Sequence, residues 1–141
     1  MGAGIGRSRP WGFNVLTRIF YVHLAFSLAV LTSALVQALT RGSQIASLSA
    51  AAGLIIAVAV GFAMFGVAKQ RSLRALFWLR LLLWMAAVRF LLGVLIVGAA
   101  SDSSAVESFR SILLNEAFFV PLAIYWSRPV HGRYLASFAN P

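Results

Sequence analysis

Four long apolar runs constrain the fold of this chain more than any other feature of its sequence. A helix needs about 20 apolar residues to cross the roughly 30 Å hydrocarbon core of a bilayer. The runs over residues 18–39, 45–68, 75–100 and 105–127 meet this length, and the fourth is the most polar of them. We therefore predict four transmembrane helices.

Composition supports a membrane protein. The chain has 141 residues, of which 61% are hydrophobic and only 11% are charged, whereas a soluble domain carries about 25% charged residues. A chain this short has a high ratio of surface to volume, so it could not hide that much apolar side chain from water. Lipid is therefore the expected solvent for most of the chain.

The absence of cysteine and the distribution of charge exclude further classes of site and partner. The chain contains no Cys, which excludes disulfides, thiolate metal sites and thiol nucleophiles. The net charge of +9 comes from basic residues that lie between the apolar runs and form no single patch. Topology explains such a distribution better than nucleic-acid binding does, so we expect no nucleic-acid partner.

Short connections join the four runs, at residues 40–43, 69–74 and 101–107. Linkers of this length force each helix to lie beside its neighbour in sequence and to run antiparallel to it. The predicted fold is an all-α, up-down, four-helix transmembrane bundle that forms a single membrane domain. Residues 1–17 precede the bundle, and residues 128–141 follow it as a tail.

Basic residues predict the orientation. One side of the membrane would hold Arg7, Arg9, Arg18, Lys69, Arg71, Arg74, Arg128 and Arg133. The other side would hold only Arg41 and Arg110. Cytoplasmic segments are enriched in Lys and Arg, so both termini should be cytoplasmic, and we expect the protein in a bacterial cytoplasmic (inner) membrane.

Two ionisable residues fall inside the last two runs, and we predict that they pair. Arg89 precedes the turn near Asp102 by about as many residues as Glu116 follows it, which at 1.5 Å per residue puts both roughly 20 Å from that turn. Each ion alone near the bilayer centre costs at least about 2.5–3.5 kcal/mol, and a guanidinium–carboxylate pair offsets much of that cost. Asn115 adds a further polar group.

The role of this pair is left open by the sequence. A buried ion pair often fixes helix register without any activity, and this is the favoured interpretation. The alternatives are a proton or substrate pathway, or an Arg89 that meets a partner subunit or a lipid phosphate instead of Glu116.

Small residues form a stripe along the second run, where Ser49, Gly53, Ala57 and Gly61 repeat every four residues. Such a stripe lets another helix approach closely. We expect it to pack within the chain, against the first or third helix. Self-association or docking on a larger membrane protein is the alternative.

His23 and Pro121 are the other notable residues inside the spans. A single intramembrane His is expected to be part of a hydrogen-bonded structure, with a quinone or proton role as the weaker alternative. His131 lies outside the spans, so haem held between two histidines is not expected. Pro121 removes a backbone hydrogen bond and should kink the fourth helix.

A second intramembrane arginine, Arg80, lies within about two turns of the predicted cytoplasmic end of its helix. It should extend its guanidinium to the headgroups. The residues expected to contact lipid headgroups are Arg80, Lys69, Arg71, Arg74 and Arg128. The basic, aromatic tail would either lie along the anionic leaflet or be disordered.

Catalytic patterns are lacking in the sequence. It contains no nucleotide-binding glycine loop in a strand–helix context, no nucleophile–base set, no paired carboxylates and no metal-spaced cluster. We therefore expect no enzyme, no cofactor and no metal site. The leading hypothesis is an accessory, assembly or interaction subunit of a membrane complex, whose partners are lipids and another membrane protein or a second copy.

The sequence leaves two alternative functions open. One is a small transporter or channel component with a polar path around Arg89, Glu116, Asn115 and His23. The other is a membrane-resident immunity-type protein, which would share the same architecture.

Overall fold

The computed structural model describes residues 9–99, 110 and 114–139, and every element in these residues is a helix. Three helices are long and apolar enough to cross a membrane. They are α1 (Phe13–Thr40), α2 (Gln44–Ala68) and α3 (Leu73–Ala99). Two shorter helices follow, α5 (Phe119–Ser127) and α6 (Pro129–Ala139). The all-helical class and the membrane-type character of the chain are thereby confirmed.

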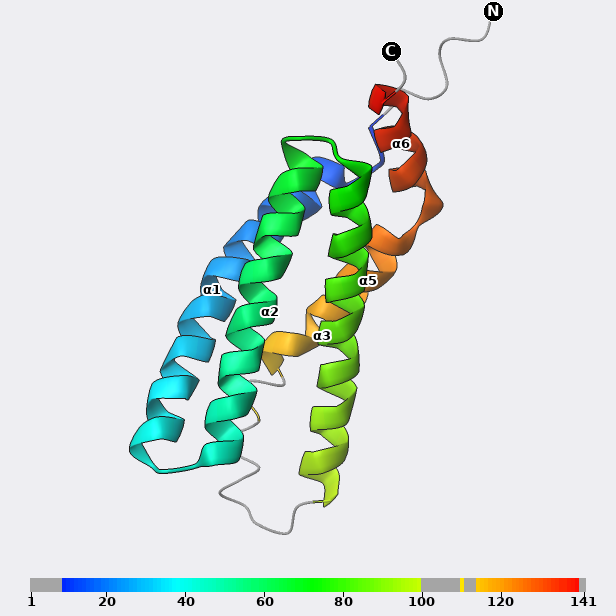
Figure 1. The fold of residues 1–141 in the computed structure, drawn as a ribbon. Coiled ribbons are helices and arrows are strands. Elements are labelled where there is room, and N and C mark those ends of the chain that lie inside the picture. Colours follow the sequence, from blue (N-terminus) through cyan, green and yellow to red (C-terminus); the bar gives the residue numbers. More distant parts are fainter. Residues whose placement is uncertain (1–8, 100–109, 111–113, 140–141) are drawn as a thin grey trace, which may run out of the picture.

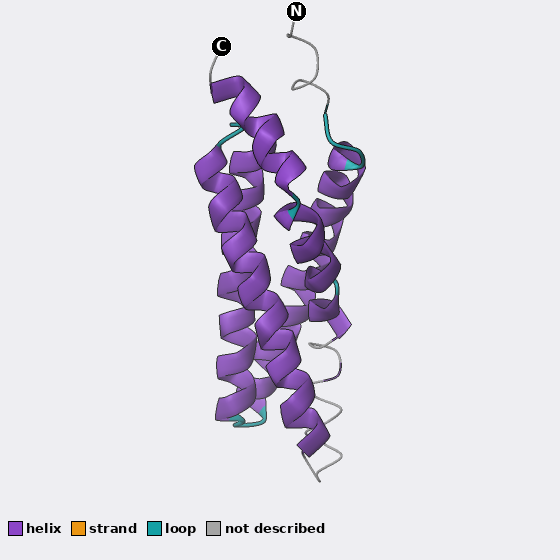
Figure 2. Cartoon of the chain, turned by 90° about the vertical axis from the view of Figure 1, so that its right-hand side faces the viewer, coloured by secondary structure: helices purple, strands orange, loops and turns teal. Residues whose placement is uncertain are grey.

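The three long helices lie side by side and alternate in direction (Figure 1). The middle helix, α2, packs against both of its neighbours, whereas α3 packs against α2, α5 and α6. Both views show α6 at the end of the molecule where α2 connects to α3 (Figures 1 and 2). The start of α1 lies at this same end (Figure 1), so the first and last described helices come together there.

Two tight turns set the order of the long helices. The turn between α1 and α2 has Gly42 at φ 70°, a left-handed conformation that costs glycine little. The Gly42 N–H bonds to the Leu39 carbonyl and the Ser43 N–H to the Ala38 carbonyl, which is the Schellman pattern of a helix end. Between α2 and α3, the Ser72 hydroxyl accepts the Ala75 N–H and so caps α3.

The first helix begins earlier than the apolar run predicted. It starts at Phe13, five positions before the predicted residue 18, because Gly12 at φ 77° provides the change of chain direction. The other two long helices begin and end within two residues of the predicted boundaries. The added residues 13–17 include the polar Asn14 and Thr17.

The fourth predicted span, residues 105–127, is not one uninterrupted helix. Residues 114–117 are helical, Phe118 is a turn, and α5 then covers nine residues, fewer than the about 20 that a crossing needs. Apart from Arg110, the first part of the predicted span lies outside the described residues. The interruption comes where Pro121, the third residue of α5, has no N–H for the carbonyl of Ala117.

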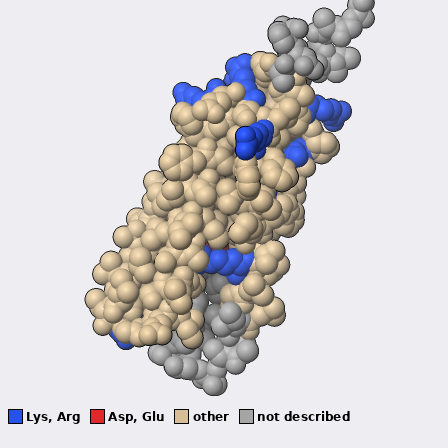
Figure 3. Space-filling view, in the orientation of Figure 1, with Lys and Arg blue, Asp and Glu red and all other residues tan. Residues whose placement is uncertain are grey.

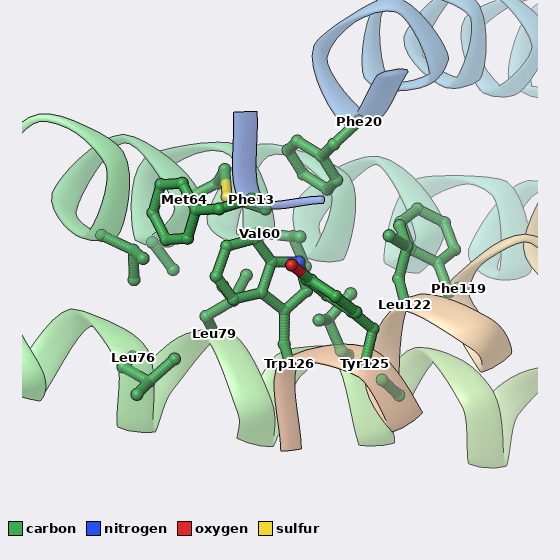
Figure 4. Packing of buried hydrophobic residues seen from close by; sticks show 14 of the residues in the cluster. Phe13, Phe20, Val60, Met64, Leu76, Leu79, Phe119, Leu122, Tyr125 and Trp126 are labelled. Carbon is green, nitrogen blue, oxygen red and sulfur yellow. The ribbon is translucent and has the colours of Figure 1, made fainter. Parts of the chain in front are cut away.

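The main buried core includes Tyr134 and Leu135 of α6, and Figure 4 shows the packing of other members of this core. Trp126 is fully buried at its centre, edge-on to Phe13 with the ring centroids 5.3 Å apart. Aliphatic side chains from α2 and α3 surround these rings, among them Val60, Met64 and Leu79. The core therefore joins the start of α1, the second half of α2, the first half of α3, and α5.

The C-terminal tail is helical over residues 129–139. The alternative of a disordered tail is therefore wrong for this part of the chain. These residues form α6, whose Tyr134 and Leu135 belong to the core. Tyr134 packs edge-on against Phe13, with 5.6 Å between the centroids, and its hydroxyl accepts a hydrogen bond from Arg9 Nε at 3.3 Å.

Candidate functional site

Arg89 and Glu116 meet inside the molecule and form an ion pair. Arg89 Nη2 lies 2.5 Å from Glu116 Oε1. Arg89 comes from the middle of α3, and Glu116 comes from the helical segment at residues 114–117. The Glu116 side chain is only 6% exposed and that of Arg89 is 18% exposed, so the carboxylate is the more enclosed of the two charges.

The second helix supplies the surface on which the guanidinium rests. Arg89 Nη2 donates to Ser49 Oγ at 3.4 Å. One turn later, a Cβ added to Gly53 would lie 2.6 Å from Arg89 Nη1 and 2.9 Å from Leu31 Cδ2. Only a residue without a side chain leaves this space, so Gly53 lets the charged group of α3 lie against the backbone of α2.

Asn115 and the first helix extend this polar cluster. Ser27 Oγ donates to Asn115 Oδ1 at 2.8 Å, and both side chains are buried. His23 lies one turn before Ser27 and stacks on Phe118 with 4.0 Å between ring centroids. Side chains from the first, second and third apolar runs therefore gather around Asn115 and Glu116.

Part of the hydrogen-bonding capacity of this cluster is unused. Among the described residues, no group bonds to the buried His23 Nε2 or Asn115 Nδ2. Buried polar atoms of this kind normally find a partner. Within the described part of the chain, one imidazole nitrogen and one amide nitrogen therefore lie unpaired beside the ion pair.

A small cavity adjoins the ion pair. Its walls are formed by Leu31, Gly53, Ile56, Ala86, Arg89, Glu116 and Phe119. The space open to the centre of a water molecule is about 10 Å³, and a single water needs about 10–15 Å³ by this measure. The cavity is therefore no larger than one water and holds no organic solute in this conformation.

The small-residue stripe of α2 faces the inside of the molecule. Gly53 and Ala57 are buried, and a Cβ on Gly61 would lie 2.8 Å from Leu24 Cδ2 of α1. With Ser49 bonded to Arg89, all four residues lie against α1 or the ion pair. Packing within the chain therefore occupies this stripe.

The Arg80 guanidinium forms two hydrogen bonds within the chain that the sequence did not indicate, and its contact with lipid headgroups stays a prediction. Its Nε donates to the Trp126 carbonyl at 2.8 Å and its Nη2 to the Arg128 carbonyl at 3.1 Å. These carbonyls lie at the end of α5, where a helix leaves its last carbonyls without internal partners. A cation at that end also complements the helix dipole, so Arg80 links α3 to the junction of α5 and α6.

The other residues expected at the headgroups lie at the α6 end of the molecule. Lys69, Arg71, Arg74 and Arg128 are exposed, and Lys and Arg side chains gather at that end (Figure 3). Arg71 Cζ lies 4.0 Å above the ring centroid of Phe138 in α6. Pro121 is exposed on α5.

Sequence reasoning missed Ser27 and the residues around His131. Ser27 follows His23 by four residues, a spacing that puts both on one helix face, and this was the available signal. His131 is fully buried among aromatic rings, which no sequence period indicates.

Comparisons with known proteins return no match to any protein-family model, curated protein or solved structure. Among the described residues, no group of three or more His, Asp or Glu could hold a metal ion.

Proposed function

We propose that this chain is an integral membrane protein of the bacterial cytoplasmic membrane that crosses it four times as an up-down bundle. In this proposal both termini are cytoplasmic, and the chain acts without chemistry of its own as an accessory or interaction subunit of a membrane complex. One observation carries the functional part: the charges of Arg89 and Glu116 neutralise each other beside a cavity no larger than one water.

The outward face of α1 supports an interaction role. The helix lies at the edge of the described bundle and packs chiefly against α2. Its exposed residues include Ala25, Ala29, Ser33 and Gln37, spaced four apart. In lipid, small residues permit close helix contact, and Ser or Gln side chains can bond across helices. A partner helix on this face would cover polar groups that otherwise face acyl chains.

Co-purification in mild detergent tests this proposal. We expect the wild-type chain to purify with one membrane protein in a fixed ratio, and Ala29→Leu on the outward face of α1 to lose it. Ala52→Leu is the matched control, because Ala52 is exposed on α2, away from the α1 face. A chain that purifies alone, or a partner lost equally with both variants, would contradict the proposal.

A transporter component is the second candidate, and the partial exposure of Arg89 favours it. An ionisable residue inside a membrane marks a solute or proton pathway by default, and the Arg89 side chain is 18% exposed beside the cavity. Reconstitution into vesicles with a proton or solute gradient decides between the two. A gradient that collapses with the wild type but not with Glu116→Gln would support transport over the subunit function.

A further inference from the structure

The junction between α6 and the rest of the molecule is built around one histidine. His131 is 0% exposed, and its ring lies 4.5 Å from that of Tyr125 and 4.7 Å from that of Trp126 by centroid distance. The ring of Phe13, at the start of α1, is 6.3 Å away. Docking of α6 therefore inserts an imidazole into an aromatic pocket formed by α1 and α5.

No described residue forms a well-aligned hydrogen bond with Nδ1 or Nε2 of this imidazole, and the Tyr125 backbone carbonyl is the polar group that favours its proton. A neutral imidazole presents one donor and one acceptor, whereas a protonated imidazole presents two donors and a charge. The pocket therefore tolerates the neutral ring and penalises the charged one, because burying an unpaired charge costs far more than burying an unpaired dipole.

The charged groups around His131 also oppose a positive imidazole. The cations nearest to it on the packed elements are Arg80 of α3 and Arg128 before α6, and Arg9 contacts the neighbouring Tyr134 and Phe13 rings. The tyrosines beside it, Tyr125 and Tyr134, carry no charge near neutral pH. The described carboxylate, Glu116, is paired with Arg89, so the described residues offer no counter-ion.

We propose that His131 makes the docking of α6 sensitive to pH: the neutral ring holds α6 in the aromatic pocket, and protonation releases it. Release would uncover Phe13 and Trp126 together with the buried face of α6. The released helix would also withdraw the Phe138 ring from Arg71. This device is independent of the proposed subunit function, because it concerns the intact chain alone.

The direction of the effect follows from proton linkage. Burial lowers the pKa of His131 from 6.5 to about 4; repulsion from Arg80 and Arg128 adds to this effect, and the Tyr125 backbone carbonyl partly opposes it. The released form, with an ordinary pKa, binds the proton more tightly than the docked form. Docking is therefore fully favoured above about pH 6.5 and weakens as the pH falls toward 4, by about 30-fold at pH 5.

Distance measurements between two spin labels test the release. The chain has no native cysteine, so Val15→Cys on α1 and Ser137→Cys on α6 give two unique labelling positions. In nanodiscs we expect a narrow distance distribution at pH 7.5 and a broad, longer one at pH 5.0. His131→Leu should keep the narrow distribution at both values, and Gly132→Ala, where nothing lies within 4 Å, should respond as the wild type does.

Two outcomes would overturn the proposal. One is a wild-type distribution that is unchanged, or narrower, at pH 5.0, as cation–π attraction to the aromatic rings would produce. The other is a broadening that persists in His131→Leu. If that variant does not fold, the imidazole resonances of the unmodified chain decide instead: a titration midpoint of His131 well below pH 6.5 supports the pH-sensitive docking of α6, and one near 6.5 refutes it.

Discussion

At the scale of single residues, the Arg89–Glu116 pair makes the most direct prediction. Arg89→Met and Glu116→Leu should each lower the free energy of unfolding by about 3 kcal/mol, because each leaves an unpaired charge inside the molecule. The double variant should recover most of this loss, since it buries no charge. Denaturant unfolding in mixed micelles measures all three.

A matched control separates this effect from a general loss of charge. Arg74 is exposed near the start of α3, so Arg74→Met should change the free energy of unfolding by no more than about 0.5 kcal/mol. Losses of the two single variants that simply add in the double variant would show that the two residues are not coupled.

Gly53 makes a second prediction at this scale. Gly53→Ala would place a Cβ 2.6 Å from Arg89 Nη1 and 2.9 Å from Leu31 Cδ2, so the guanidinium or α1 must shift. We expect a loss of about 1–3 kcal/mol from overpacking, despite the better helix propensity of Ala. Gly132→Ala is the control, because that site in α6 is open and the propensity gain there is up to about 1 kcal/mol. Equal effects of both substitutions on the thermal midpoint would contradict the close contact.

At the scale of elements, Arg80 is predicted to fasten α5 and α6 to α3. Arg80→Gln removes two charge-assisted bonds to the carbonyls of Trp126 and Arg128, each contributing about 1.5–3 kcal/mol before relaxation. The loss should be local, so amide hydrogen exchange should accelerate in residues 128–139 and stay unchanged in α2. If Arg80 served only the headgroups, exchange in α6 would match that of the wild type, and lipid binding alone would change.

The helices also show how much of this structure can be predicted from the sequence. Length and hydropathy suffice for α1, α2 and α3, because a bilayer requires long apolar helices whatever their packing. Equal distance from one turn was enough to predict that Arg89 and Glu116 lie at similar depth. Depth does not determine how each helix is rotated about its own axis, because packing sets that rotation. The contacts of Ser27 and Ser49 therefore could not be predicted from depth. The break at Phe118 accompanies the missing N–H of Pro121, where the sequence predicts a kink. The docking of α6 depends on aromatic contacts between distant segments, which no local period encodes.

At the scale of the whole molecule, the uneven distribution of charge predicts its orientation. The acidic residue among the described ones, Glu116, is paired with Arg89, whereas Lys and Arg side chains gather at the end that holds α6 (Figure 3). An anionic inner leaflet attracts such an end by about 1 kcal/mol for each basic residue near it. The turn at the opposite end, between α1 and α2, holds the single basic residue Arg41, whereas the α2–α3 connection and the start of α3 hold Lys69, Arg71 and Arg74.

Cysteine accessibility tests both this orientation and the fourth crossing. The turn between α1 and α2 offers Ser43, whose side chain makes no capping bond, and the connection between α2 and α3 offers the exposed Gln70. In intact cells, a membrane-impermeant maleimide should label Ser43→Cys, whereas Gln70→Cys should react only after lysis. Because α3 leads away from the Gln70 side, Ser137→Cys in α6 can share that side only if the chain between α3 and α6 crosses back. We therefore expect Ser137→Cys to react like Gln70→Cys. Labelling of position 137 from outside would show that α3 is the last crossing, and the bundle would then have three spans.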